Sequence, residues 1–129
     1  TLLQKIALSA AIVVTTPQDI AVADTMKGIE MLKKLNLPIL GLIENMSYFE
    51  PKDSKKRYYL YGKGGAKTLA KEYQLDLLGE VPQFEFEESN LTNQNKEISK
   101  ILDLIANKVV KKLDSMSSKN KSLIPQVNK

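Results

Sequence analysis

Pro38-Ile39-Leu40-Gly41-Leu42-Ile43-Glu44-Asn45-Met46-Ser47 is an apolar run that stops abruptly at a Glu-Asn pair. The run lacks polar alternation, which is typical of a strand buried on both faces in a parallel α/β sheet. Ligands in such sheets bind outside the carboxyl ends of the strands. Asn45 is therefore placed where recognition is expected, with an amide that can donate and accept hydrogen bonds. The alternative is that Asn45 only caps a turn.

A strand-helix-strand unit surrounds this run. Ala10 to Thr16 is a second apolar run rich in β-branched residues, which predicts another buried strand. Thr16-Pro17-Gln18-Asp19 has the pattern of a helix start, with a hydroxyl at the N-cap and proline at the first helical position. The helix should end near Leu35, and its buried face should carry Val22, Met26, Ile29 and Leu32. Residues 11–43 therefore have the length of a parallel right-handed crossover.

The later part of the chain continues the alternation of strands and helices. We expect a short strand at Tyr58-Tyr59-Leu60-Tyr61, then a helix with Ala66, Leu69, Ala70 and Tyr73 on one face. Leu77 to Pro82 is a further predicted strand, and the last helix should span roughly Lys96 to Leu113. Residues 115–129 are rich in Ser, Lys and Asn, so the sequence predicts one domain over residues 1–114 and a flexible tail after it.

Two loops each allow two interpretations, one structural and one functional. Tyr48 to Arg57 is charged and irregular, and is either a solvated loop or a surface for a partner or an anionic ligand. The second loop resembles a phosphate-binding loop but is one residue shorter than the full pattern; its sequence is Lys63-Gly64-Gly65-Ala66-Lys67-Thr68. It is either a phosphate site or a structural turn that leads into a helix.

Composition excludes several kinds of chemistry. The 129-residue chain has no cysteine and no histidine, so this chain supplies neither thiolate nor imidazole for catalysis or metal binding. Its charge of +4 comes from lysines spread along the chain, which argues against nucleic acid as the main partner. No apolar run approaches the length of a membrane span, which is about 18 residues, so we expect a cytoplasmic protein without a membrane partner.

The carboxylates offer no evident acid-base pair. Asp19, Asp24, Glu80 and the acidic segment 85–88 show no pairing in sequence that indicates acid-base chemistry. Pro82 stands at a strand end, as Asn45 does, and usually such a proline only terminates the strand. If the two strands are neighbours, the Pro82 ring and the Asn45 amide could flank a planar ligand.

Several blocks of the sequence resemble one family. They are Thr15-Thr16-Pro17-Gln18-Asp19-Ile20-Ala21, Asp24-Thr25 with Lys27-Gly28-Ile29, Pro38-Ile39-Leu40-Gly41, Glu44-Asn45-Met46-Ser47-Tyr48-Phe49, Gly62 to Lys67, and Leu77-Leu78-Gly79-Glu80-Val81-Pro82. Over about residues 1 to 82 the chain is similar to the Mrp-type iron-sulfur cluster carrier ATPases. This resemblance implies a deviant P-loop NTPase that binds ATP, forms a homodimer and passes an iron-sulfur cluster to recipient apoproteins.

The resemblance also implies roles for particular residues. Asn45 would read the adenine edge, the backbone around Pro82 and Gln83 would line the base, and residues 16–19 would lie near the dimer face. The family's phosphate loop and magnesium-binding aspartate lie N-terminal to everything present here. The chain therefore resembles only the C-terminal half of a P-loop NTPase domain with a Rossmann-like fold, and it should not hydrolyse ATP alone.

The cluster ligands of the family are missing from this chain. Many members carry a Cys-x-x-Cys pair after the block that ends at Phe49, whereas this chain has Glu50-Pro51-Lys52-Asp53. We therefore assign no catalytic residue and no metal ligand to it. The leading hypothesis is that this chain is part of an ATP-binding iron-sulfur cluster carrier. The alternative is that it is a non-catalytic interaction module without nucleotide or cluster chemistry. A partition-type ATPase half is a third possibility, which the block Glu44 to Phe49 disfavours.

Overall fold

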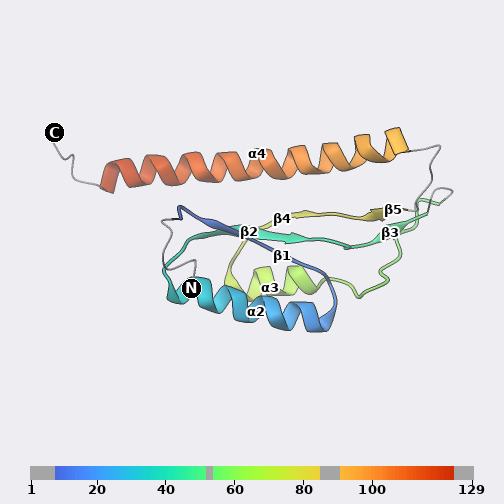
Figure 1. The fold of residues 1–129 in the computed structure, drawn as a ribbon, viewed down its shortest axis with the longest axis horizontal. Coiled ribbons are helices and arrows are strands. Elements are labelled where there is room, and N and C mark those ends of the chain that lie inside the picture. The colour runs from blue at the N-terminus through green and yellow to red at the C-terminus, as the bar shows by residue number, and fades with distance from the viewer. Residues whose placement is uncertain (1–7, 52–53, 85–90, 124–129) are drawn as a thin grey trace.

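A parallel sheet between two helical layers forms the molecule. The computed structural model describes residues 8–51, 54–84 and 91–123. In that part of the chain, the main sheet has the order β1-β2-β4, with all strands parallel: β1 (Ala11–Thr15), β2 (Ile39–Glu44) and β4 (Leu77–Glu80). Helices α2 (Asp19–Lys34) and α3 (Gly65–Tyr73) cover one face, and α4 (Leu91–Leu123) crosses the other (Figure 1). This arrangement confirms the expected α/β fold with a mostly parallel sheet flanked by helices.

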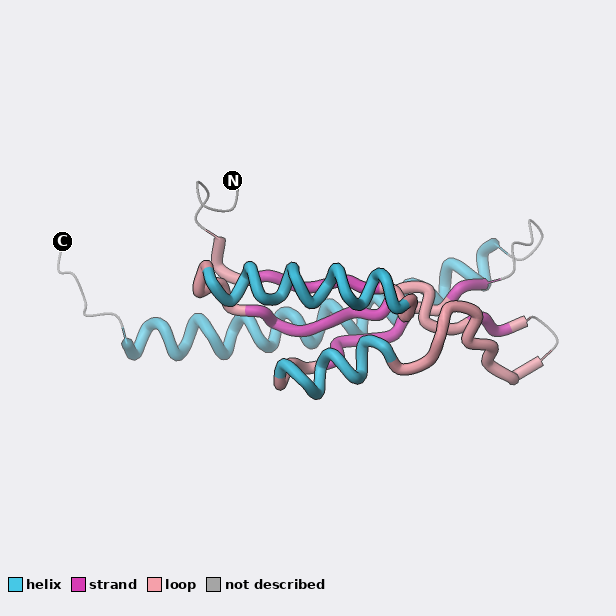
Figure 2. Tube along the Cα trace, turned by 90° about the horizontal axis from the view of Figure 1, so that it is seen from below, coloured by secondary structure: helices cyan, strands magenta, loops and turns pink. Residues whose placement is uncertain are grey.

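The predicted strand-helix-strand unit is present. β1 pairs with β2 in parallel, and Thr15 lies opposite Glu44 at the carboxyl ends. Ile29 of α2 is fully buried against Leu42 of β2, together with Leu69 and Ala70 of α3. Viewed from the side of α2 and α3, these helices run along the strands while α4 lies behind the sheet (Figure 2). The core therefore sits between the sheet and the α2–α3 layer.

The start of α2 differs from the prediction. The helix begins at Asp19, and its N-cap residue is Gln18, whose side chain makes no capping hydrogen bond. The Thr16 hydroxyl instead donates to Gln18 Oε1 at 3.4 Å. Pro17 is buried, and its carbonyl oxygen lies 3.2 Å from where a Cβ on Gly65 would stand. Pro17 therefore packs against the start of α3, and residues 16 and 17 do not form the first turn of α2.

The segment expected as a strand at residues 58–61 is not one. Only Tyr58 forms a bridge, antiparallel to Phe49, and the next residues form a turn. The sequence also gave no indication of the small parallel sheet that joins β3 (Phe49–Glu50) to β5 (Gln83–Phe84). Two-residue strands are too short for any periodicity, so their pairing depends on where β2 and β4 end.

Helix α4 is longer than predicted at both ends. It packs on β4 and β2, where Ile105 is buried over Gly79. The Lys108 ammonium donates to the carbonyl of Leu78 at 3.2 Å, and Lys112 pairs with Asp76. The helix continues to Leu123, whereas a flexible tail was expected from residue 115. Extending an established helix is far easier than nucleating one, and Met116 still lines a groove together with Leu40 of β2. Residues 124–129 lie outside the described residues.

A pair of glycine substitutions tests the packing of β2. We expect Gly41→Ala to destabilise the chain by about 1–3 kcal/mol, because the new Cβ would lie 2.6 Å from the backbone oxygen of Asp76. Gly28→Ala in α2 is the matched control, since a Cβ there meets nothing within 4 Å and should stabilise the helix by about 0.5–1 kcal/mol. Urea unfolding followed by circular dichroism measures both changes, and equal midpoints for the two variants would contradict this packing.

Candidate functional site

The carboxyl ends of β2 and β4 lie side by side at the same end of the sheet, called the site edge below, and the predicted site residues follow these two strand ends. Ser47 N–H donates to the carbonyl of Val81 at 3.0 Å, and Gln83 N–H donates to that of Tyr48 at 2.7 Å. The segment after β2, which contains Asn45, therefore lies beside the segment that contains Pro82 and Gln83. The two strands are neighbours, which was the condition for Asn45 and Pro82 to flank one ligand.

Asn45 is exposed and held in a tight turn. Its N–H donates to the carbonyl of Thr15 at 2.8 Å, and its Oδ1 accepts from the Met46 N–H at 2.9 Å. Met46 has a positive φ of 53°, so the chain reverses direction directly after the strand. Asn45 thus caps a turn, which was the alternative interpretation of this residue. Its side chain is nevertheless exposed at the carboxyl end of β2. Its contact with adenine stays a prediction.

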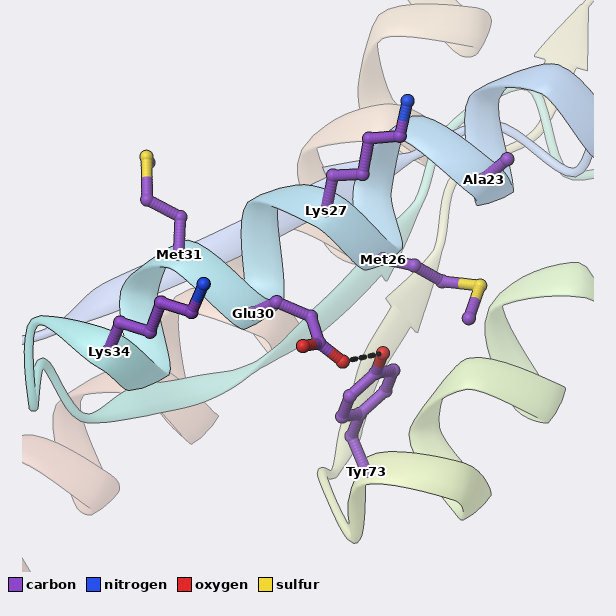
Figure 3. Close-up of a pocket in the computed structure, with 7 residues that line it drawn as sticks. All are labelled: Ala23, Met26, Lys27, Glu30, Met31, Lys34 and Tyr73. Atoms are coloured by element: carbon purple, nitrogen blue, oxygen red, sulfur yellow. Dashed lines mark hydrogen bonds between the residues drawn. The ribbon is translucent and has the colours of Figure 1, made fainter.

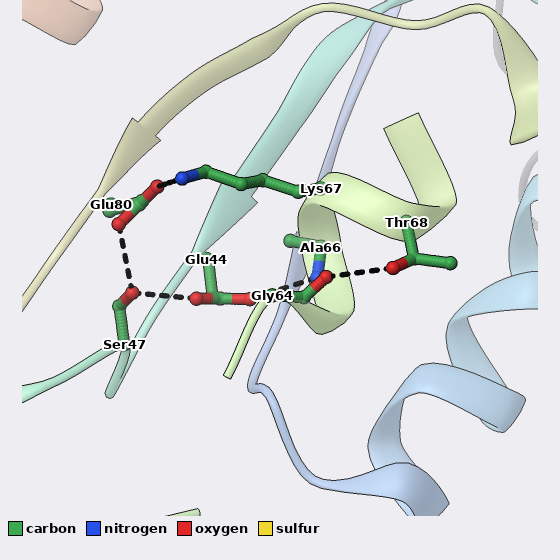
Figure 4. A network of polar contacts seen from close by, with 7 residues as sticks. All are labelled: Glu44, Ser47, Gly64, Ala66, Lys67, Thr68 and Glu80. Atoms are coloured by element: carbon green, nitrogen blue, oxygen red, sulfur yellow. Dashed lines mark hydrogen bonds and ion pairs between the residues drawn. The ribbon is translucent and has the colours of Figure 1, made fainter. Parts of the chain in front are cut away.

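A buried carboxylate next to Asn45 organises this edge. Glu44 is 3% exposed, and its Oε2 accepts from the Ala66 N–H at 2.8 Å in the first turn of α3. Its other oxygen, Oε1, accepts from the Ser47 hydroxyl at 2.6 Å (Figure 4). Glu44 therefore joins the end of β2, the turn after it and the start of α3. Glu44 was not among the predicted site residues, although a carboxylate that ends a buried strand requires hydrogen-bond donors.

Glu80 belongs to the same network, although no pairing was evident for it in the sequence. Its Oε2 lies 3.3 Å from the Ser47 hydroxyl oxygen, and its Oε1 lies 3.5 Å from the Lys67 ammonium (Figure 4). A hydroxyl has a single proton, so Ser47 donates to one carboxylate at a time, and the shorter contact is the one to Glu44. Lys67 compensates the charge of Glu80 at this end of the sheet.

The glycine loop before α3 is a structural turn in this arrangement. Gly62 and Gly64 have positive φ angles of 110° and 79°, which reverse the chain before the helix. The Ala66 N–H that would face a phosphate is occupied by Glu44, and the Thr68 hydroxyl donates to the Gly64 carbonyl at 3.0 Å. These contacts favour the structural turn over a phosphate site.

A basic and aromatic hairpin stands beside the site. Phe49 and Tyr58 exchange two backbone hydrogen bonds of 2.7 Å each. Cations lie over three tyrosine rings of this loop: Arg57 over Tyr48 at 4.0 Å, Lys63 over Tyr59 at 4.8 Å and Lys56 over Tyr58 at 5.3 Å from the ring centroids. Residues 54–64, which precede α3, contain four basic residues and no acidic one. The loop therefore forms a positively charged surface next to the carboxyl ends of the strands.

A groove lies between α2 and α3, away from the carboxyl ends of the strands. It has a volume of about 570 Å³ and is lined by Ala23, Met26, Lys27, Glu30, Met31, Lys34 and Tyr73 (Figure 3). The Tyr73 hydroxyl donates to Glu30 at 2.9 Å, and this hydrogen bond raises the pKa of Tyr73. Lys34 and Tyr73 are the last residues of α2 and α3, so this end of the groove faces the amino ends of the strands. Its position argues against a role in nucleotide binding.

The described residues hold no group of three or more His, Cys, Asp or Glu side chains that could bind a metal ion. The acidic segment 85–88 lies outside the described residues. Among the helices that the structure describes, none is both long and apolar enough to cross a membrane.

Removal of the Glu44 carboxylate tests the network. We expect Glu44→Ala to destabilise the chain by about 1–3 kcal/mol, because the buried donors of Ala66 and Ser47 lose their acceptor. Glu80→Ala is the control: this side chain is 26% exposed and paired with a largely exposed lysine, so its loss should cost less than about 1 kcal/mol. Chemical denaturation measures both, and a larger loss for Glu80→Ala would contradict the central place of Glu44.

Alkaline unfolding tests the burial of Tyr48. Desolvation raises the pKa of Tyr48 above its ordinary 10.0, and the nearby Arg57 charge opposes this shift. The folded state keeps the phenol proton to higher pH than the unfolded chain does. This stabilisation is therefore complete below about pH 10 and is lost as the pH rises through the folded pKa. Stability curves of Tyr48→Phe should fall less between about pH 9.5 and 11, and those of Arg57→Gln should fall more. An unchanged slope in Tyr48→Phe would contradict the assignment.

The sequence is similar to one family of known proteins. The family described as "ParA: NUBPL iron-transfer P-loop NTPase" matches residues 1–119. The iron-sulfur cluster carrier protein of Aquifex aeolicus is 48% identical over 82 residues, which cover 64% of this chain and 22% of the relative. The iron-sulfur cluster transfer protein NUBPL of Mus musculus is 48% identical over 79 residues, which cover 61% of this chain and 25% of the relative.

A solved structure agrees with these matches. The nucleotide-binding protein from Archaeoglobus fulgidus in complex with ADP superposes with a TM-score of 0.50 and 30% identity, over 78% of this chain and 35% of that one. The chain spans about a quarter of the length of the curated relatives it matches. The family model covers most of the chain, and the chain belongs to the NUBPL iron-transfer P-loop NTPase family.

Proposed function

We propose that this chain supplies the adenine-recognition edge of an ATP-binding iron-sulfur cluster carrier. The observation that carries the proposal is the position of Asn45, exposed at the end of β2 and beside the segment with Pro82 and Gln83. An amide can pair with both the donor and the acceptor on the edge of adenine. The buried Pro82 and the backbone of Gln83 would line the base. The ADP complex of the related Archaeoglobus protein supports a nucleotide as the ligand.

The residues that bind the phosphates and those that ligate the cluster would be supplied by other parts of the complete assembly. The N–H at the start of α3 is occupied by Glu44, and the chain has no cysteine or histidine. This chain therefore contributes base recognition and not hydrolysis or cluster ligation. The iron-sulfur cluster is the cargo, which the complete assembly would pass to recipient apoproteins. Residues 16–19, next to an Ile20 side chain that is 81% exposed, would contribute to the face of a homodimer in the cytoplasm.

A second candidate is an interaction module that keeps the fold without nucleotide or cluster chemistry. The observation that favours it is the hairpin described above, whose residues Lys55, Lys56 and Arg57 follow the segment 50–53, where the family resemblance would place a cysteine pair and this chain has none. Its exposed Tyr58 and Leu60 lie among lysines and Arg57, which suits an acidic protein segment with apolar side chains. In this case the chain would bind a partner and show no preference for adenine.

An adenine-binding assay distinguishes the candidates. A fusion that places the part of the Aquifex relative N-terminal to its matched region in front of this chain should bind a fluorescent ATP analogue, whereas the chain alone should bind it weakly and show no turnover. Asn45→Ala in the fusion should weaken ATP binding about tenfold, or about 1.4 kcal/mol, and reduce the preference for ATP over GTP.

The exposed Asn107→Ala on α4 is the matched control and should leave both quantities unchanged. If Asn45→Ala binds ATP as tightly as the parent fusion, the adenine-recognition proposal is wrong. If the folded fusion does not bind ATP at all, the interaction module becomes the better account. Robust magnesium-dependent hydrolysis by the chain alone would contradict the division of labour proposed here.

A further inference from the structure

The groove between α2 and α3 is long enough to hold a short helix. Its volume is about 570 Å³, and its lining runs along α2 from Ala23 to Lys34, with Tyr73 of α3 on the other side (Figure 3). This stretch of α2 extends about 18 Å at 1.5 Å per residue, or about three helical turns. The groove lies on the face of the sheet opposite α4, so α4 does not cover it (Figure 1).

The floor of the groove is apolar. Met26 and Tyr73 pack against the core cluster that contains Ile29 and Leu69. Met31 lies at the rim, where it is 44% exposed. Methionine side chains are flexible and polarizable, so they adapt to apolar side chains of different shapes, and they are common on surfaces that bind helices. The floor therefore suits the apolar face of an amphipathic helix.

Two lysines border the groove on the α2 side. Lys27 and Lys34 are seven residues apart, which is about two helical turns, and both point to the same side of α2 as Met31 (Figure 3). Among the described residues, neither of these two ammonium groups forms an ion pair. Both are therefore available to the carboxylates of a bound molecule.

The negative side chains near the groove interact with α3 instead. Glu30 points toward α3, where its carboxylate accepts a hydrogen bond from the Tyr73 hydroxyl at 2.9 Å (Figure 3). This hydrogen bond, and to a smaller extent the charge of Glu72, raises the pKa of Tyr73. The Lys33 ammonium lies 4.9 Å from the centroid of the Tyr73 ring, which offsets negative charge on this side. The rim on the α2 side is therefore the part of the groove that attracts negative groups.

We propose that this groove binds an amphipathic helix of a partner protein, with apolar side chains against Met26 and Met31 and with carboxylates, seven residues apart, that pair with Lys27 and Lys34. Charge complementarity along the α2 rim favours this acidic occupant. A helix is favoured over an extended segment because the backbone groups of the two flanking helices are already paired, whereas an added strand needs an open sheet edge. The inference goes beyond the proposed function, since it requires neither ATP nor a cluster.

Binding of a designed peptide tests the groove. The probe is a fluorescein-labelled peptide of about 18 residues, long enough to be helical, with leucines at i, i+3, i+4 and i+7 and glutamates at two flanking positions seven residues apart. A comparison peptide carries lysine in place of these two glutamates. Fluorescence anisotropy with the whole chain should show micromolar binding of the glutamate peptide, about tenfold tighter than that of the lysine peptide.

A charge reversal on α2 provides the second measurement. Lys34→Glu should weaken binding of the glutamate peptide about tenfold and tighten binding of the lysine peptide by about the same factor. An effect on folding would weaken both. Lys100→Glu, at an exposed position on α4, is the matched control and should change neither. Circular dichroism should show equal helix content in the parent and both variants, because both lysines are exposed.

Any of three outcomes would overturn the proposal. The first is no binding of the glutamate peptide up to about 1 mM, and the second is equal affinity of this peptide for the chain and for Lys34→Glu. The third is a dimer of the chain that Lys34→Glu dissociates, because a second copy would then occupy the groove. Peptide binding as expected, together with a fusion that binds no ATP, would leave this site intact and contradict the proposed function instead.

Discussion

The Glu44 carboxylate is the contact on which the arrangement of the site depends. It ends the central strand in a nearly water-free position, so it is tolerated only because an α3 N–H and the Ser47 hydroxyl bind its two oxygens. These bonds fix α3 relative to the sheet and fix the turn after β2. The exposed Asn45 is thus oriented by a residue that itself is inaccessible to any ligand.

Much of this fold could be predicted because its elements carry strong local patterns. The two-sided strand 39–44 and the Val22–Ile29 stripe specify parallel pairing and a covering helix without reference to any other part of the chain. The Glu44–Ser47–Glu80 network could not be predicted in the same way, since it joins residues whose proximity depends on how β2 and β4 align. The same reason explains the missed β3–β5 pair and the wrong start of α2, where Pro17 packs against Gly65.

The glycine loop shows how tertiary contacts decide between two readings of one motif. Gly64 and Lys67 occur in an order that suggests phosphate binding, yet the helix N-terminus already holds a carboxylate from β2. A negative charge at that position satisfies the positive end of the helix dipole and repels a phosphate. The internal carboxylate therefore takes the place that an external anion would otherwise occupy.

The length of α4 affects how the molecule behaves in solution. Its 33 residues extend about 50 Å at 1.5 Å per residue, whereas the six residues of β2 cover about 20 Å. A compact domain of this size has a radius of gyration of about 14 Å. The helix thus extends well past the sheet, so the molecule is rod-like and tumbles anisotropically. The helix packs on β4 through its middle, at Ile105 and Lys108, so small rotations there become larger displacements at the helix ends.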